Sequence, residues 1–318
     1  MTFSIIKRDR TIENYKASKI GDAVSAAFAS IGEVCPAEAL ETLIAAIEKE
    51  LEGIAENGSV RVEQIQDNVE IELMRAGFYR QARRFILYRE ERAKDRAYIN
   101  EIEQTVGLEG MHRLLKDVQR DYPHLCKSFG KLVSKYHAFH KPSMTAEEGL
   151  HALTRAAVEC ITAEEPDWEF VAGRLYSFQN DLNILRKMEG LQLQSLYDKL
   201  SYLTTEGYYG AYILESYTKA EIDLAETFLQ PERDRLLTYS GLDLLLRRYT
   251  VRNFVHEQLE TPQEMYLGIA LHLAMRETQN RMDHVRAFYD MLSKQQVSMA
   301  TPTLANARKP HHQMSSCF

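Results

Sequence analysis

Cysteine is scarce in this sequence, and closely spaced cysteine pairs are absent. Four cysteines occur among 318 residues, far apart at positions 35, 126, 160 and 317. Because no Cys-x-x-Cys pair occurs, the sequence disfavours a structural disulfide framework and a zinc ribbon, and no metal site is predicted. The first three cysteines stand in apolar helical contexts, where such thiols are usually inert core residues.

Long apolar runs and an excess of positive charge are also missing. No run approaches eighteen apolar residues, and the N-terminus has no apolar stretch long enough for a signal peptide. We therefore expect a soluble, cytoplasmic protein without a membrane partner. The net charge of −7 argues against a sequence-independent nucleic-acid binder, which needs a basic face.

No linker rich in glycine, serine or proline interrupts the chain. A hydrophobic content of 45% and a charged content of 27% are ordinary for a globular protein. A length of 318 residues suits two or three domains. We expect these domains to pack together, and we place their limits at residues 1–100, 101–195 and 196–318.

Helical patterns dominate the chain. Capping boxes begin at Thr145, and at Thr261 with proline next to it, and each precedes an apolar stripe of helical spacing. Ser18 is a further candidate cap. Extended segments are expected in a hairpin within residues 1–15, in a short piece at 59–62, and at 296–300 before a Thr-Pro turn. The fold is predicted to be mainly α.

A basic hairpin near the N-terminus is the first candidate site. Lys7 and Arg8 flank a turn, Lys19 stands in the first turn of the following helix, and an arginine-rich helix covers 83–92. Several cations around one point suit a polyphosphate, and Glu13 can accept a hydrogen bond from a base or ribose. The same charges also fit a solvated hairpin beside a charged helix.

The end of the chain is the second candidate site. Thr301 precedes a proline, and a Ser-Ser-Cys follows, with Cys317 sixteen residues after Thr301. Hydroxyls and backbone amides at strand ends bind phosphate and sugar oxygens, and an exposed cysteine can act as a redox thiol. A cysteine near a terminus can equally have no chemical role.

Together these motifs resemble one known family. The hairpin Ile5-Ile-Lys-Arg-Asp9, the segment Val62–Glu70 and the helix end Tyr88–Arg92 look like an ATP cone. The stretch after Tyr208 and the Thr-Pro-Thr to Ser-Ser-Cys ending look like the start of a catalytic barrel. The whole chain is similar to the N-terminal part of the large (alpha, catalytic) subunit of class I ribonucleotide reductase.

The resemblance implies a fold in three parts. An ATP cone, with a small β-hairpin or sheet and a four-helix bundle, would occupy residues 1–100. A helical domain, possibly a degenerate second cone, would occupy 101–195. Residues 196–318 would form the helical approach and the first strands of a ten-stranded α/β barrel that is truncated.

The resemblance also implies roles for single residues. Thr301 and Ser316 match positions that hold the substrate, and Cys317 matches the first of two catalytic cysteines that end as a disulfide. Lys7, Glu13 and Lys19 match nucleotide-contacting positions, with Arg8 beside them. The family places a further basic contact near Arg89 and Arg92.

Two residues depart from the family pattern in the cone. Arg10 stands where a glycine is usual, so we expect the hairpin turn to avoid a positive φ there. Val62 stands where a nucleotide-contacting threonine is expected, which removes one hydroxyl.

The implied activity is ribonucleoside-diphosphate reduction to deoxyribonucleotides. ATP and dATP, with Mg²⁺, would be allosteric effectors, and a thioredoxin- or glutaredoxin-type protein the reductant. The implied partners are a radical-generating small subunit, the remainder of the large subunit, and further copies in a homo-oligomer. The alternative is an ATP-cone module that senses nucleotides without a catalytic role.

The sequence stops one residue after Cys317. In the family the radical-bearing cysteine and the partner of Cys317 would lie beyond Phe318, so the chain alone is expected to be inactive. A split gene, an intein-interrupted subunit and a fragment each account for such a chain.

Overall fold

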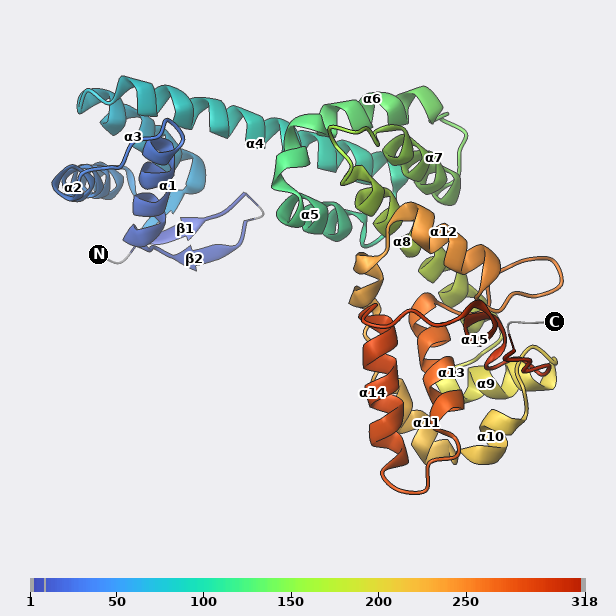
Figure 1. Ribbon diagram of the computed structural model, residues 1–318. Coiled ribbons are helices and arrows are strands. Elements are labelled where there is room, and N and C mark those ends of the chain that lie inside the picture. Colours follow the sequence, from blue (N-terminus) through green and yellow to red (C-terminus); the bar gives the residue numbers. More distant parts are fainter. Residues whose placement is uncertain (1–2, 9, 316–318) are drawn as a thin grey trace. The chain divides into compact units, whose positions relative to one another are not determined.

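A computed structural model describes residues 3–8 and 10–315 of the chain. The chain divides into two compact units, residues 1–97 and 98–318. The boundary falls inside α4 (Tyr79–Val106), the long cyan helix of Figure 1. Each unit has its own apolar core, and each is described below by itself.

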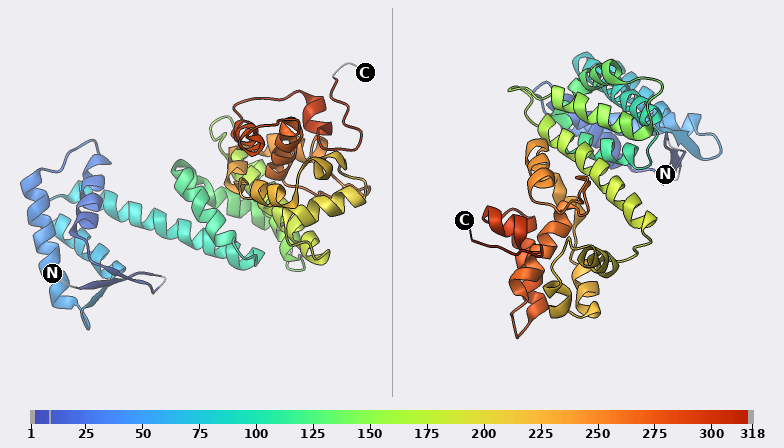
Figure 2. Two further views of the ribbon diagram at one scale, coloured as in Figure 1. Left: turned by 90° about the horizontal axis from the view of Figure 1, so that it is seen from below. Right: turned by 90° about the vertical axis from the view of Figure 1, so that its right-hand side faces the viewer.

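The first unit contains a three-stranded sheet in the order β2-β1-β3. β1 (Ser4–Ile6) pairs antiparallel with β2 (Ile12–Asn14) and parallel with β3 (Ser59–Arg61). Ile5 stands opposite Val60 in this register, and both are buried in the core of the unit. The predicted hairpin and the predicted extended piece are therefore confirmed, and the left view of Figure 2 shows the hairpin from below.

Helices complete the first unit. They are α1 (Ala17–Ala29), α2 (Ala37–Ile54), α3 (Val62–Arg75) and the first part of α4. Positive φ angles at Asn57 and Gly58 form the turn before β3, and another at Gly77 separates α3 from α4. The sheet and helices share one core, which includes Val24, Phe28, Leu43, Ile47, Leu51, Val60, Val69 and Leu73.

Two details of the first unit differ from the sequence predictions. Arg10 has a φ of 66°, although we expected the turn to avoid this conformation. Its amide donates to the Lys7 carbonyl, and the Lys7 amide donates to the Thr11 carbonyl, so pairing across the hairpin end outweighs the cost of about 1–2 kcal/mol for left-handed backbone. Ser18 is not a cap, because α1 begins at Ala17 and the N-cap residue is Lys16.

The first half of the second unit is a helical cluster. It comprises the end of α4, α5 (Met111–Asp121), the 3₁₀ helix η1 (Pro123–Ser128), α6 (Phe129–Phe139), α7 (Ala146–Glu159) and α8 (Trp168–Gly190). The capping box predicted at Thr145 is confirmed, because Thr145 accepts from the amide of Glu148 and donates its own amide to the Glu148 carboxylate. Trp168 and Phe129 pack together in the fully buried centre.

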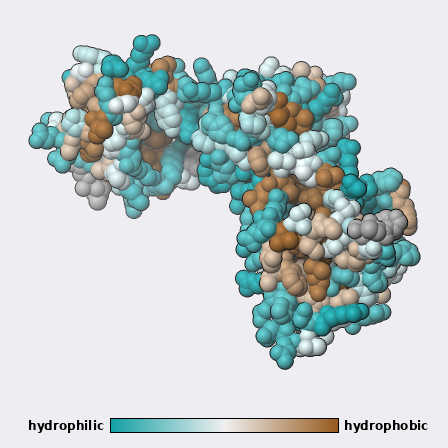
Figure 3. Space-filling view, viewed as in Figure 1, coloured by the Kyte–Doolittle hydropathy of each residue, from teal (hydrophilic) through white to brown (hydrophobic). Residues whose placement is uncertain are grey.

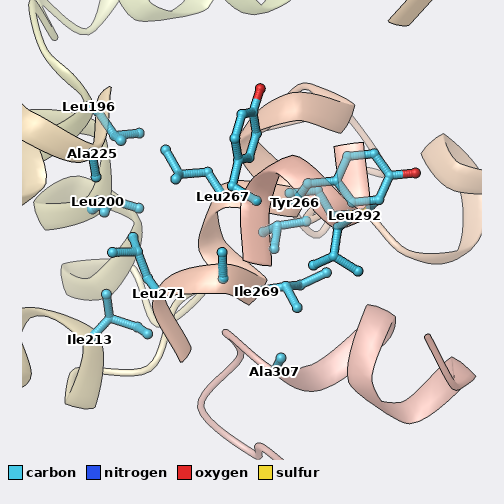
Figure 4. Packing of buried hydrophobic residues seen from close by; sticks show 14 of the residues in the cluster. Leu196, Leu200, Ile213, Ala225, Tyr266, Leu267, Ile269, Leu271, Leu292 and Ala307 are labelled. Carbon is cyan, nitrogen blue, oxygen red and sulfur yellow. The ribbon is translucent and has the colours of Figure 1, made fainter. Parts of the chain in front are cut away.

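The second half is also helical. It comprises α9 (Leu196–Thr205), α10 (Tyr212–Ser216), α11 (Lys219–Glu226), the 3₁₀ helix η2 (Pro231–Leu236), α12 (Tyr239–Arg248), α13 (Pro262–Ala274), α14 (Arg281–Ser293) and α15 (Thr301–Asn306). The capping box predicted at Thr261 is confirmed at the start of α13. Figure 4 shows α13 at the centre, with Leu267 and Leu271 near Leu200 and Ile213.

The strand predicted at 296–300 is wrong. These residues are irregular, and α15 follows them directly. Pro302 explains the difference, because its fixed φ and missing N–H suit the first turn of a helix. Residues 98–315 contain an isolated bridge between Arg252 and Gln258 and no strand. The first barrel strands expected there are therefore not seen in the described residues.

Hydrophilic residues cover much of the surface, and hydrophobic residues form smaller patches on the face in Figure 3. Among residues 3–8 and 10–315, no helix is long and apolar enough to cross a membrane.

Candidate functional sites

A lysine–glutamate–lysine cluster joins the sheet to α1. Lys7 follows β1, Glu13 lies in β2, and Lys19 lies in the first turn of α1. Lys7 Nζ donates to Glu13 Oε1 at 2.5 Å, and Lys19 Nζ donates to Glu13 Oε2 at 2.8 Å. The antiparallel pairing of β1 and β2 brings Lys7 next to Glu13, and the first turn of α1 brings Lys19. Each of the two ammonium groups binds one oxygen of the carboxylate.

The cluster is charged and open to solvent. Hydrogen bonds from Lys19 and then Lys7 lower the pKa of Glu13 to about 2, so Glu13 is a carboxylate at neutral pH. Two ammonium groups around one carboxylate leave one net positive charge. The side chains of Lys7, Glu13 and Lys19 are 41%, 40% and 55% exposed, so a dissolved anion can reach both lysines.

Arg8 connects the hairpin turn to α3. Its Nε lies 2.7 Å from Glu63 Oε1, and its Nη2 donates to Gln66 Oε1 at 2.8 Å. The guanidinium of Arg8 also acts on Arg96. Burial is the largest cause that lowers the pKa of Arg96, and the positive charge of Arg8 is the next. The sequence predictions did not include Glu63, Gln66 or Arg96, although the spacing of Glu63 and Gln66 on one helix face was a possible signal.

Arg89 and Arg92 have different surroundings on α4. Arg89 Nη2 donates to Asp67 Oδ1 at 2.9 Å, and Nη1 donates to the Glu70 carboxylate. These two acids neutralise Arg89. Arg92 Nε donates to the hydroxyl of Tyr88 at 3.1 Å, and its charge also acts on Arg96. Arg8, Arg92 and Arg96 are therefore electrostatic neighbours, whereas Arg89 is engaged with α3.

The second predicted site is described only in part. Thr301 is the exposed first residue of α15, and its Oγ1 lies 3.4 Å from the hydroxyl of Tyr249. Ser316 and Cys317 lie outside the described residues. Their predicted grouping with Thr301 is therefore not tested.

A buried ion pair lies beside Thr301, and the sequence predictions missed it. The side chains of Arg308 and Glu260 are 0% and 1% exposed. Arg308 Nε donates to both Glu260 oxygens at 3.0 and 3.1 Å, and Tyr209 donates its hydroxyl to Glu260 at 2.6 Å. Arg308 also donates to the backbone carbonyls of Leu304 at 2.7 Å and Tyr249 at 2.8 Å.

A cavity of about 380 Å³ opens between α5, α8 and η2. Its lining includes two acids, the partly buried Asp181 and the buried Asp234. Burial raises the pKa of Asp181 to about 7 and that of Asp234 to about 8, and each sits near further negative charge. No local sequence pattern pointed to this pair, since the two residues are far apart along the chain.

Two family models match the chain. The ATP cone domain matches residues 3–94, and the all-alpha domain of ribonucleotide reductase matches residues 235–312. The first match contains the cluster of Lys7, Glu13 and Lys19. The second contains the ion pair of Arg308 and Glu260, together with Thr301.

Curated relatives match over more of the chain. The alpha subunit of ribonucleoside-diphosphate reductase from Treponema pallidum is 44% identical over 99% of this chain and 38% of its own length. The alpha subunit from Chlamydia pneumoniae is 28% identical over 99% of this chain and 32% of its own. The alpha subunit of ribonucleoside-diphosphate reductase 1 from Escherichia coli is 28% identical over 67% of this chain and 28% of its own length.

The chain thus spans less than two fifths of the length of these relatives. The match with the Treponema protein nonetheless runs across both units, and the ATP cone match precedes the all-alpha match along the chain. The chain belongs to the family of ribonucleotide reductase alpha subunits, and it carries an ATP cone domain and an all-alpha domain of that family.

Proposed function

We propose that the Lys7–Glu13–Lys19 cluster binds an adenine nucleotide effector, ATP or dATP. The observation that carries the proposal is that two ammonium groups from different elements converge on one exposed carboxylate within the ATP cone match. A Lys ammonium has three donors, so each lysine can hold Glu13 and a phosphate oxygen together. Glu13 accepts from a base or ribose donor, and Mg²⁺ accompanies the phosphates.

Arg8 and Arg92 belong to the same proposal as longer-range cations. Arg8 is 38% exposed and bound on one side by Glu63 and Gln66. Its charge, with those of Arg92 and Arg96, raises the positive potential near the hairpin and attracts a polyphosphate. Arg89 contributes less in this arrangement, because Asp67 and Glu70 neutralise it.

The effector proposal is tested by titration calorimetry with ATP and with dATP. Lys7→Ala and Lys19→Ala should each weaken binding roughly tenfold or more, which corresponds to about 1.4 kcal/mol for a lost charged hydrogen bond. Lys49→Ala, an exposed lysine on α2, is the matched control and should bind like the wild type. Absence of binding by the wild type at millimolar nucleotide would remove the proposal.

For the chain as a whole we propose a part in ribonucleoside-diphosphate reduction. Thr301 and Ser316 contact the substrate, and Cys317 is one of two cysteines that supply two electrons and two protons as the ribose hydroxyl leaves as water. The cysteine pair becomes a disulfide, which a thioredoxin- or glutaredoxin-type dithiol reduces again. The radical comes from a small subunit. The support is the match with alpha subunits across both units.

The domain arrangement proposed for this role has a cone at 1–100, a helical domain at 101–195 and, from 196 onward, the helices that lead into an α/β barrel. Cys317→Ser tests the catalytic part in the assembled reductase with small subunit, dithiol and substrate. We expect loss of dithiol-dependent turnover, with ATP binding unchanged. Full turnover by this variant would favour the second candidate, a nucleotide-sensing module in which Cys317 has no role.

A further inference from the structure

We propose that Arg308 is a positioning residue for Thr301, and that it acts through Tyr249. This inference rests on the proposed function, in which Thr301 contacts the substrate. Arg308 donates to the Tyr249 carbonyl at 2.8 Å, and the Tyr249 hydroxyl lies 3.4 Å from Thr301 Oγ1. One residue therefore links the buried guanidinium to the exposed hydroxyl.

A second connection runs through the backbone of α15. Arg308 Nη1 donates to the carbonyl of Leu304 at 2.7 Å, and Leu304 lies one turn after Thr301. The carbonyl of Arg308 itself accepts from the amide of Gly210 at 2.9 Å. The fully buried side chain of Arg308 thus contacts the backbone of α15, and the Tyr249 hydroxyl contacts Thr301, the first residue of that helix.

The groups around Arg308 hold its guanidinium in one orientation. Glu260 takes its Nε and Nη2, and Glu260 is itself fixed by the Tyr209 hydroxyl and by the amide of Val251 at 2.7 Å. A Cβ at Gly268 would lie 2.8 Å from Arg308 Cδ, so only glycine leaves room for the side chain. A planar fork of this kind gives directional contacts that an ammonium cannot reproduce.

Packing alone would not require such a group at this place. A buried ion pair often contributes little net stability relative to apolar residues of similar size, whereas it fixes one arrangement of its neighbours. Here the neighbours that it fixes are Tyr249 and α15, which carry the hydroxyl proposed to contact substrate. The geometry therefore favours a role in orientation.

The test measures KM for a ribonucleoside diphosphate in the assembled reductase, with three single variants and one double variant. Tyr249→Phe removes only the hydroxyl that faces Thr301, so we expect it to raise KM about as much as Thr301→Ala, on the order of tenfold. The double variant should show no further increase over Thr301→Ala, because the Tyr249 hydroxyl acts only through the Thr301 hydroxyl. Arg308→Lys should raise KM at least as far. The melting temperature of Tyr249→Phe should stay near that of the wild type.

Lys199→Met is the matched control. It removes another buried ion pair of the same unit, in which Lys199 is held by Glu264 at 2.7 Å, and neither residue contacts α15 through a hydrogen bond. We expect a lower melting temperature and an unchanged KM.

An unchanged KM for Arg308→Lys or for Tyr249→Phe, or additive effects of Tyr249→Phe and Thr301→Ala, would overturn the positioning role. Should Arg308→Lys fail to fold, Glu260→Asp, which shifts the carboxylate that holds Arg308, takes its place with the same expectation. A wild-type reductase without turnover would instead refute the proposed function, so the two failures are distinguishable.

Discussion

The buried acid Asp234 makes the stability of the second unit depend on pH. Asp234 is 5% exposed, and its Oδ1 accepts from Gln263 Nε2 at 2.6 Å. Burial raises its pKa to about 8, and the charge of Asp181 adds to the effect. The folded state therefore keeps a proton on Asp234 at a pH where the unfolded chain, with a pKa of about 3.9, has lost it.

The sign of the resulting pH dependence follows from this difference. Because the folded state binds the extra proton, the free energy of unfolding falls as pH rises from about 4 to about 8, and it levels off above that range. Asp234→Asn keeps the acceptor for Gln263 and removes the titration. We expect a flatter stability profile between pH 4 and 8, and a variant more stable than the wild type at pH 8.

Urea unfolding at a series of pH values, followed by circular dichroism, checks this prediction. Asp283→Asn, which changes an exposed carboxylate on α14, should keep the slope of the wild type. An unchanged slope for Asp234→Asn would contradict the role assigned to this acid.

Among single residues, the sequence predicted the exposed charged cluster but not the buried ion pair. Lys7, Glu13 and Lys19 lie within thirteen positions of one another, so a hairpin and a helix start sufficed to group them. Glu260 and Arg308 are 48 positions apart, and each looks like an ordinary surface residue until the packing of α13 and α15 is known. Their burial depends on tertiary structure, which local patterns do not contain.

At the scale of elements, close packing at Gly173 decides how α8 meets the chain after η2. A Cβ at this position would lie 2.7 Å from the carbonyl oxygen of Leu237, a contact that backbone cannot relieve without moving. Helix propensity alone would favour alanine over glycine by about 1 kcal/mol. The packing contact should outweigh that gain.

Gly173→Ala is therefore expected to destabilise the protein, by about 1–3 kcal/mol as for other overpacked sites. Gly190→Ala in the same helix is the control, because its added Cβ meets nothing within 4 Å and the change should be neutral or stabilising. Thermal melts of both variants make the comparison. Equal melting temperatures for the two would show that the backbone near Leu237 yields easily.

Element predictions succeeded where the signal was local. The capping boxes at Thr145 and Thr261 are single-turn features, and both are present in the structure. The strand expected at 296–300 failed, because a short apolar run has no fixed structure until a partner strand exists. No strand pairs with it among residues 98–315, and Pro302 begins a helix instead.

At the scale of the whole molecule, the two units should respond differently to a nucleotide. The proposed effector cluster lies in residues 1–97. A ligand that binds only the folded state stabilises it by about 2.7 kcal/mol at one hundred times its dissociation constant. We expect calorimetric melting to show two transitions, of which ATP raises only one.

Lys19→Ala should abolish that shift without altering the other transition. A fragment of residues 1–106, which retains all of α4, should show the ATP-sensitive transition alone. An equal shift of both transitions with ATP would contradict the assignment of the nucleotide to the first unit.

The division between the two units lies within a helix rather than a loop. Ala82 and Phe85 on α4 belong to the core of the first unit, and Ile99, Ile102 and Val106 belong to the core of the second. Between these groups stands a dense set of basic residues that trypsin recognises in sequence: Arg89, Arg92, Lys94 and Arg96. Proteases bind their substrates in an extended conformation, which a residue cannot adopt while it is part of a helix. The segment richest in tryptic sites should therefore survive brief digestion, and cleavage there would report the moment at which α4 unwinds.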